Sequence, residues 1–419
     1  MDESVLDKLK ILAESAKYDV SCASSGTSRG HKAGAIGSAA GWGICHSFAE
    51  DGRCISLLKI MLTNYCRYDC AYCINRRSND IPRATLSVTE LVNLTIEFYR
   101  RNYIEGLFLS SGVVRNPDYT MERLVRIVKD LRTIHRFNGY IHLKGIPGAS
   151  PELIHEAGLY ADRMSVNIEI PNEKSLQTLA PEKDFQSVFT PMRHIQQGVL
   201  ESAEERKKYR SAPRFAPAGQ STQMIIGATP DSDKDILRLS SALYQRPTMK
   251  RVYYSGFVPV NAYDNRLPQL KQPPLVRENR LYQADWLLRF YQFKVDEIVN
   301  DAYPDLDLDV DPKLAWALRH PEVFPVDINK ADYEMLLRVP GIGVKSAKII
   351  IVSRRYANLG SEQLKKIGVV MKKASYFITC RELPTQTVNE VSPETVRQLL
   401  TRKSGKKVDD RQLILPFID

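Results

Sequence analysis

The sequence of 419 residues contains no uninterrupted apolar stretch of the length that a membrane-spanning helix needs. Its first four residues, MDES, lack the basic and then apolar pattern of a secretory signal peptide. Cysteine is sparse: seven residues in all, three of them crowded into one octapeptide, which does not suit a disulfide framework. These absences argue against membrane-embedded and disulfide-stapled secreted proteins. They predict a cytoplasmic protein without a membrane partner.

The composition is that of a globular protein, and its positive charge is unevenly placed. Hydrophobic residues make up 43% and charged residues 26%, and the length allows two or three domains. The formal net charge is +10. Residues 326–419 carry 17 Lys+Arg against 10 Asp+Glu, whereas the other 325 residues carry 42 against 39. Most of the excess therefore lies in the last quarter of the chain, which predicts contact with a polyanion there.

Three cysteines at CxxxCxxC spacing, Cys66, Cys70 and Cys73, are the clearest chemical signal, and Tyr72 precedes the last of them. Thiolates are soft ligands, and three of them can hold an iron–sulfur cluster while leaving one iron open to another molecule. The preceding residues 55–62 read as a buried strand. The cysteines thus lie on a loop that leaves a strand, where barrel enzymes place their chemistry.

Zinc binding and redox chemistry are the alternatives for these thiols. A structural zinc site usually has four ligands, but no Cys or His follows within the next forty residues. The nearest upstream candidates are Cys54 and His46. Cys22, Cys45 and Cys54 could ligate a second cluster, although their irregular spacing favours free thiols.

After a predicted N-terminal helix, strand and helix signals alternate from residue 55 to about 257. Strands are predicted over 55–62, 104–109, 140–144, 164–169, 222–227 and 251–254, and helices over 5–16, 87–101, 119–136, from 150, within 173–208 and over 233–245. Six consecutive strand–helix units predict an α/β fold with a parallel sheet and right-handed crossovers. Prolines mark 258–279 as a connection, and 280–299 reads as a strongly apolar helix that docks on the sheet domain.

The basic C-terminal region contains a second motif. Helices are predicted over 329–338 and 344–354, on either side of a tight turn that resembles a helix-hairpin-helix motif. Glycines there let the backbone approach a phosphate, toward which the amides of the next helix point. The predicted nucleic-acid contacts are Pro340, Gly341, Ile342, Gly343, Lys345 and Lys348. A weaker second copy runs over 364–376, and a role in protein contacts alone is the alternative.

The chain ends in a polar, charged stretch followed by an apolar peptide, Gln412–Phe417. The peptide resembles the short segment with which bacterial repair proteins dock on the sliding clamp. Folding back onto the same chain and docking on a dedicated partner are the alternatives. Either way, an apolar peptide on a flexible tether is expected to be buried against some surface.

The cysteine motif on the loop after a first strand resembles that of the radical S-adenosylmethionine superfamily. This resemblance implies a partial (β/α)6 barrel, a [4Fe-4S] cluster on the three cysteines and S-adenosylmethionine on the open iron, cleaved to a 5′-deoxyadenosyl radical. The contacts it implies with S-adenosylmethionine are Tyr72, Ser111, Gly112, Asn167, Glu169 and Gly227. Two departures stand out: Ser110-Ser111-Gly112 lacks the usual acid, and the segment ending at Gly227 lacks its first glycine.

Taken together, barrel and hairpin resemble bacterial radical S-adenosylmethionine proteins classed with DNA modification or repair. The implied organisation is an N-terminal extension near the cluster (1–54), the barrel (55–257), a connection with a docking helix (258–325), a small all-α helix-hairpin-helix domain (326–400) and a flexible tail (401–419). The implied radical takes hydrogen from a nucleotide that is unstacked or flipped first. Flavodoxin or ferredoxin is the expected electron donor. RNA modification and radical activation of a protein partner remain as alternatives.

Overall fold

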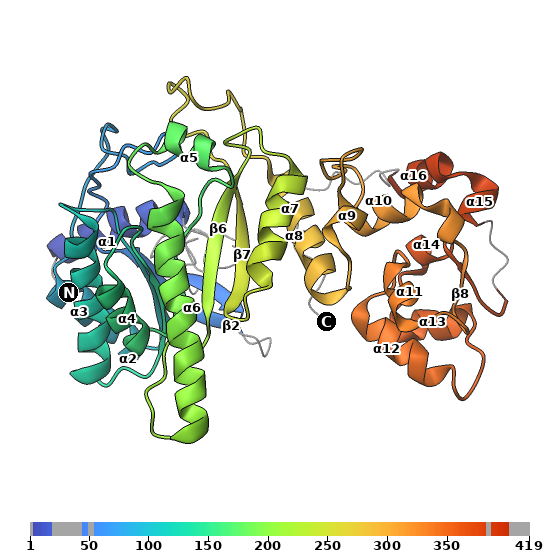
Figure 1. The fold of residues 1–419 in the computed structure, drawn as a ribbon, viewed down its shortest axis with the longest axis horizontal. Helices are drawn as coiled ribbons and strands as arrows, with labels where there is room; N and C mark the ends of the chain where they lie inside the picture. The colour runs from blue at the N-terminus through green and yellow to red at the C-terminus, as the bar shows by residue number, and fades with distance from the viewer. Residues whose placement is uncertain (1–2, 19–43, 49–53, 383–386, 402–419) are drawn as a thin grey trace, which may run out of the picture. The chain divides into compact units, whose positions relative to one another are not determined.

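The computed structural model describes residues 3–18, 44–48, 54–382 and 387–401 (Figure 1). These residues form two compact units. The first contains the described residues up to Pro230 together with 242–274, and the second contains 231–241 and the residues from Leu275 onward. Each unit is described by itself below.

The first unit is built on one seven-stranded sheet whose strands follow each other in chain order. Its strands are β1 (Ile44–Phe48), β2 (Cys54–Met61), β3 (Gly106–Ser110), β4 (Tyr140–Lys144), β5 (Arg163–Ser165), β6 (Gln220–Ile226) and β7 (Met249–Gly256). Strands β2 to β7 are parallel, and β1 adds an antiparallel edge that the sequence patterns had not predicted. Because β7 does not pair with the first strand, the barrel is partial, and the predicted α/β class is confirmed.

Helices cover the outer face of this sheet. They are α2 (Val88–Arg100), α3 (Pro117–Thr133), α4 (Pro151–Tyr160) and α6 (Phe185–Lys208), and they pack side by side in chain order (Figure 1). Helix α1 (Glu3–Ser15), followed by the short turn Ala16–Tyr18, packs on β2, and α5 (Glu173–Leu179) precedes α6. The predicted helix start at Ser87 is confirmed, because Ser87 and Glu90 form a reciprocal capping box.

The fourth parallel strand is shorter than predicted. It ends at Ser165 instead of 169, because Thr222 on β6 takes over the next backbone bonds. Its Oγ1 donates to the Val166 carbonyl (2.8 Å) and accepts the Ile168 N–H (3.1 Å), which separates the two strands. Pairing resumes at Glu169, whose φ of +64° is the left-handed conformation.

The second unit is mainly helical. Its elements are α7 (Asp233–Tyr244, up to Ser241), α8 (Leu275–Phe290), α9 (Val295–Ile298), α10 (Pro312–Arg319), the turn Pro321–Val323, β8 (Val326–Asp327), α11 (Tyr333–Arg338), α12 (Val344–Ser353), α13 (Ser361–Ile367), α14 (Met371–Ala374), β9 (Ile378–Thr379), α15 (Val388–Val391) and α16 (Pro393–Thr401). The predicted helix over 280–299 is wrong in its bounds. Gln292 adopts a φ of +60°, and the next residue, Phe293, packs against Trp316 of α10 with ring centroids 5.6 Å apart. That buried contact replaces the continuation of the helix.

Two helical hairpins, α11–α12 and α13–α14, form the C-terminal part of this unit. The predicted helix over 329–338 begins later, at Tyr333, because the Asp332 side chain caps it by accepting the Met335 N–H. The short parallel pair β8–β9, which the all-α prediction did not include, ties the chain before the first hairpin to the chain after the second. The weaker second copy predicted over 364–376 corresponds to the hairpin formed by α13 and α14.

Candidate functional site

The cysteine loop leaves β2 and returns at Ala84, and backbone bonds hold it against the neighbouring strand. The Leu62 N–H donates to Ser110 (2.8 Å), and the Arg67 N–H donates to Val113 (2.8 Å). Arg83 donates from its guanidinium to four carbonyls inside the loop, those of Asn64, Asn75, Arg76 and Asn79, at 2.5 to 2.9 Å. A guanidinium that satisfies four carbonyls gives an irregular loop a fixed shape.

Cys66, Cys70 and Cys73 line one cavity of about 160 Å³. Its other lining residues include no further Cys or His. Among the described residues, no three His, Cys, Asp or Glu side chains converge closely enough to share one metal ion. Three thiols on one cavity suit a cluster, in which each of three irons takes one cysteine sulfur.

Burial shapes the chemistry of these thiols. It raises the pKa of Cys73 to about 12 and also raises that of Cys70, so both are neutral thiols without a metal. Loading the site must therefore release protons, as metal binding to thiols generally does. Backbone N–H groups already point at two of the sulfurs: Val113 donates to Cys66 Sγ at 3.4 Å, and Asn75 donates to Cys73. Such bonds stabilise negative charge on ligand sulfur.

Of the six residues predicted to contact S-adenosylmethionine, five line the same cavity and one does not. Those that line it are Tyr72, Ser111, Gly112, Asn167 and Glu169. Gly227 is absent from the lining, and a Cβ there would meet Pro274 instead. From β6, Gln223 and Ile225 face the cavity, and Gln223 accepts a hydrogen bond from Asn167 at 3.4 Å.

Gly112 has a steric role that its motif did not reveal. A Cβ at this position would lie 2.3 Å from the Tyr65 carbonyl oxygen and 3.2 Å from Cys66 Cβ. The Gly112 N–H also donates to the Thr63 carbonyl at 2.8 Å. Only a glycine lets the loop after β3 approach the first cysteine this closely.

Two lysines in the cavity were not predicted. Lys144, the last residue of β4, lies 3.8 Å from the Glu169 carboxylate. Lys183, between α5 and α6, lies 3.5 Å from the Tyr72 hydroxyl and forms no ion pair within the described part of the chain. Burial alone lowers the pKa of Lys183, but the surrounding acidic groups, the Glu169 carboxylate among them, raise it above its ordinary value. Lys183 is thus a fixed positive charge beside the cysteines.

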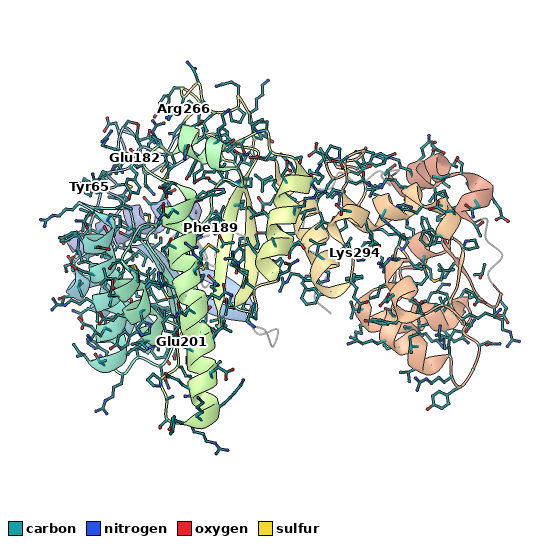
Figure 2. All side chains as sticks on the ribbon, in the orientation of Figure 1. Tyr65, Glu182, Phe189, Glu201, Arg266 and Lys294 are labelled. Carbon is teal, nitrogen blue, oxygen red and sulfur yellow. The ribbon has the colours of Figure 1, made fainter. Side chains whose placement is uncertain are left out.

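The cavity also contains one unused acceptor, the buried Oδ1 of Asn75, which accepts no hydrogen bond from the described residues. Buried polar atoms without partners are rare in proteins, and they indicate an absent donor. Figure 2 places Tyr65, Glu182 and Arg266 at the end of the unit that bears this loop, with Glu201 of α6 toward the other end. Glu182 reaches the loop directly, accepting the Asp69 N–H at 3.2 Å.

The predicted nucleic-acid residues lie on the α11–α12 hairpin. Gly341 has a φ of +87°, and a Cβ there would meet the Val370 carbonyl at 2.6 Å. The glycine is therefore required by the packing of the two hairpins, and the Val370 N–H donates to the Gly341 carbonyl at 2.9 Å. Buried Lys313 donates to the Ile342 carbonyl of the same turn at 2.5 Å.

The lysines of α12 lie at the surface, whereas the start of the helix is partly covered. No side chain caps this helix at Gly343, although Tyr291 accepts a hydrogen bond from the Val344 backbone. Lys345 and Lys348 are exposed and form no ion pair with any described residue. Cys22, the side chain of Cys54 and the apolar peptide Gln412–Phe417 lie outside the described residues, and Cys45 forms no disulfide with a described residue.

Residues 60–211 match the family model described as the Radical SAM superfamily. The chain therefore contains a radical SAM domain, and in this superfamily that domain uses a [4Fe-4S] cluster and S-adenosylmethionine. No curated protein matches the sequence. Within the described residues, no helix is long and apolar enough to cross a membrane.

Several solved structures are similar to this chain. The FeFe-hydrogenase maturase HydG from Carboxydothermus hydrogenoformans is 14% identical, with a TM-score of 0.43 over 54% of this chain and 50% of that one. The match thus spans half the length of HydG. Methylornithine synthase (PylB) is 16% identical, with a TM-score of 0.39 over 55% and 61%. A radical SAM methyltransferase from Sphaerobacter thermophilus is 14% identical, with a TM-score of 0.39 over 57% and 69%.

Proposed function

We propose that this radical SAM enzyme acts on a nucleic acid, in DNA modification or repair. The observation that carries the proposal is the pair of matched hairpins. Each has a glycine with positive φ at its turn, Gly341 (+87°) and Gly368 (+96°). Four residues after each glycine stands an exposed lysine, Lys345 or Lys372, without an ion-pair partner among the described residues. Paired basic turns suit two phosphate backbones.

In the first unit, Cys66, Cys70 and Cys73 would hold the cluster. When bound, the cluster supplies the electron that cleaves S-adenosylmethionine to a 5′-deoxyadenosyl radical, and a donor such as flavodoxin or ferredoxin replaces that electron. The Asn75 Oδ1, which accepts no hydrogen bond from the described residues, offers an acceptor to the methionyl ammonium. At Ser111, where an acid would usually stand, this chain has a hydroxyl, so the ammonium needs another acceptor. A hydrogen bond from a charged ammonium is stronger than one between neutral groups.

At the other side of the cavity, Lys183 offers a positive charge to the methionyl carboxylate. Glu169 and Asn167 offer acceptors to the ribose hydroxyls, and Tyr72 offers a flat surface to the adenine. Gly227 lies outside the cavity lining and is therefore not a proposed contact of S-adenosylmethionine. Phe257 and Ile225 add apolar walls to the cavity.

Binding of nucleic acid tests the proposal. The full chain, purified without oxygen, should bind duplex and single-stranded DNA with an affinity that falls steeply with salt. The double variant Lys345→Ala, Lys372→Ala should bind more weakly and show a smaller salt slope. A control double variant, Lys330→Ala with Lys365→Ala, removes lysines that pair with acids of the same unit, and it should bind nearly as tightly as the wild type.

The outcome also separates the alternatives. Tighter binding to matched RNA than to DNA would move the proposal to RNA modification. No salt-dependent binding to either would refute it, leaving activation of a protein partner as the remaining role. The sliding-clamp hypothesis for Gln412–Phe417 is tested separately, with a peptide of residues 408–419, and the outcome leaves the nucleic-acid proposal untouched.

A further inference from the structure

The segment after the last barrel strand, residues 257–267, contributes to the cysteine loop. The sequence patterns predicted only a connection here. In the structure, Phe257 begins the segment by donating its N–H to the Ile226 carbonyl at 2.8 Å. Phe257 and Val258 line the cavity, and Asn261 lies beneath the loop with 1% of its surface exposed. We call residues 257–267 the strap.

Asn261 contacts the part of the loop that bears the last cysteine. Its Nδ2 donates to the Ala71 carbonyl at 2.7 Å and to the Cys73 carbonyl at 3.0 Å. Its Oδ1 accepts from Asn79 Nδ2 at 2.8 Å. All hydrogen-bonding groups of this buried amide are therefore used, and the orientation of the amide is fixed.

The two carbonyls held by Asn261 bracket one residue, Tyr72. Fixing both leaves the backbone through Tyr72 and Cys73 little freedom, so the ring of Tyr72 and the sulfur of Cys73 keep their places. Without Asn261, the Ala71 carbonyl would lose its donor, at about 1–3 kcal/mol, and the Cys73 carbonyl would keep only the Arg76 N–H at 3.3 Å. No other described side chain donates to both of these carbonyls.

An ion-pair network ties the strap to the same loop at a second point. Arg76 is 5% exposed and makes a bidentate pair with Asp69, at 2.9 and 2.7 Å. It also donates to Asp264 of the strap at 2.7 Å. The bonds from Arg76 to Asp69, and those from Arg266 and Arg76 to Asp264, hold the pKa of both carboxyl groups well below the ordinary range, so they stay charged. The network anchors the strap, and Asn261 is the residue of the strap whose side chain donates to the carbonyls on both sides of Tyr72.

We propose that Asn261 is a positioning residue for the cluster. Through the Ala71 and Cys73 carbonyls it holds Cys73 and Tyr72 in the arrangement that the cluster and its open iron require. The loop before β3 is thus completed by residues that follow β7, nearly two hundred positions later in the chain. This proposal is independent of the substrate.

The test replaces Asn261 with the nearly isosteric Asp. In Asn261→Asp an oxygen faces the two carbonyls in place of the donor. The reconstituted protein should lose iron to a chelator about 10- to 100-fold faster than wild type. Changing a residue that holds a metal ligand in place generally weakens metal binding by a factor of this size. The electron paramagnetic resonance spectrum of the reduced cluster should also differ from that of the wild type. The change in this spectrum when S-adenosylmethionine is added should differ as well.

The matched control is Asn329→Asp. Asn329 makes the same kind of amide clamp in the second unit, to the carbonyl (3.1 Å) and N–H (2.8 Å) of Leu359. This variant should keep the wild-type spectrum and rate of iron loss. If Asn261→Asp does not fold, Asn261→Ala decides, because it removes both donated bonds without placing a charge against the carbonyls. Faster iron loss in Asn261→Ala supports the proposal.

Two results would overturn it. One is a wild-type spectrum and wild-type iron retention in a folded Asn261→Asp protein, or in Asn261→Ala if the first variant does not fold. The other is equal iron loss in the Asn329→Asp control, which would mean that general destabilisation, and not the contact with the loop, releases the cluster.

Discussion

Replacing Gly112 with alanine should damage the cluster site with a single added methyl group. The new Cβ would lie 2.3 Å from the Tyr65 carbonyl oxygen and 3.2 Å from Cys66 Cβ. The first contact is about 1 Å short of an ordinary van der Waals separation. Since its partner is backbone, no side chain can rotate away, and the loop around Cys66 must move by a comparable distance.

That displacement breaks specific bonds. The Gly112 N–H bond to Thr63 (2.8 Å) and the Val113 N–H bond to Cys66 Sγ (3.4 Å) both depend on the close approach. Overpacking of this kind generally destabilises a protein by about 1–3 kcal/mol. Metal–ligand distances tolerate only about 0.2 Å. We therefore expect a folded apoprotein with on the order of tenfold less reconstituted cluster.

The assay is anaerobic reconstitution followed by measurement of iron and acid-labile sulfide per chain. The control is Gly145→Ala, a glycine that lines the same cavity and whose added Cβ would meet nothing closer than 3.3 Å. It should assemble a cluster at nearly the wild-type level. Full iron content in Gly112→Ala, with the control equally loaded, would refute the steric reasoning.

Three further predictions concern single residues. Burial lowers the pKa of Lys313 to about 7, so the unfolded chain binds the proton of this lysine more tightly than the folded chain does. The free energy of unfolding of the second unit should therefore rise with pH from pH 7 upward, by about 1.4 kcal/mol per pH unit at most. Urea titrations at several pH values, followed by tryptophan fluorescence, check this. If the free energy of unfolding of Lys313→Met rose equally with pH, the prediction would be contradicted. Lys183→Met should weaken S-adenosylmethionine binding about 10- to 100-fold in anaerobic calorimetry. An unchanged Kd would exclude the proposed contact between Lys183 and the methionyl carboxylate. Gly341→Ala should lower the melting temperature of the second unit, because the methyl group meets the Val370 carbonyl, and an unchanged melt would contradict that packing.

The barrel was predictable because its signals are local. Each parallel strand is a short apolar run, and the helix after Ser87 starts at a capping box that the sequence displays. The early end of β5 was not predictable, since it depends on Thr222, which replaces a backbone partner only once the strands are adjacent. The break after Phe290 likewise depends on burial of Phe293 against Trp316, a tertiary contact.

The site was predictable where spacing carries the chemistry. The three cysteines and Tyr72 stand within eight residues, and the structure brings them to one cavity. Lys183 and Asn261 gave no such signal, because each acts on the loop from a distant part of the chain. Lys144 could have been noticed as the last residue of a predicted strand, where barrel side chains point toward the site.

The most direct test of the whole account is product analysis after anaerobic reconstitution. The full chain, with reductant and S-adenosylmethionine, is incubated with DNA, with matched RNA or without substrate, and 5′-deoxyadenosine and the nucleotides are measured. The account predicts 5′-deoxyadenosine from the wild type, more of it and an altered nucleotide with DNA, and none from Cys70→Ala. Equal 5′-deoxyadenosine from Cys70→Ala would contradict the cluster assignment, and product formation that neither DNA nor RNA affects would contradict a nucleic-acid substrate.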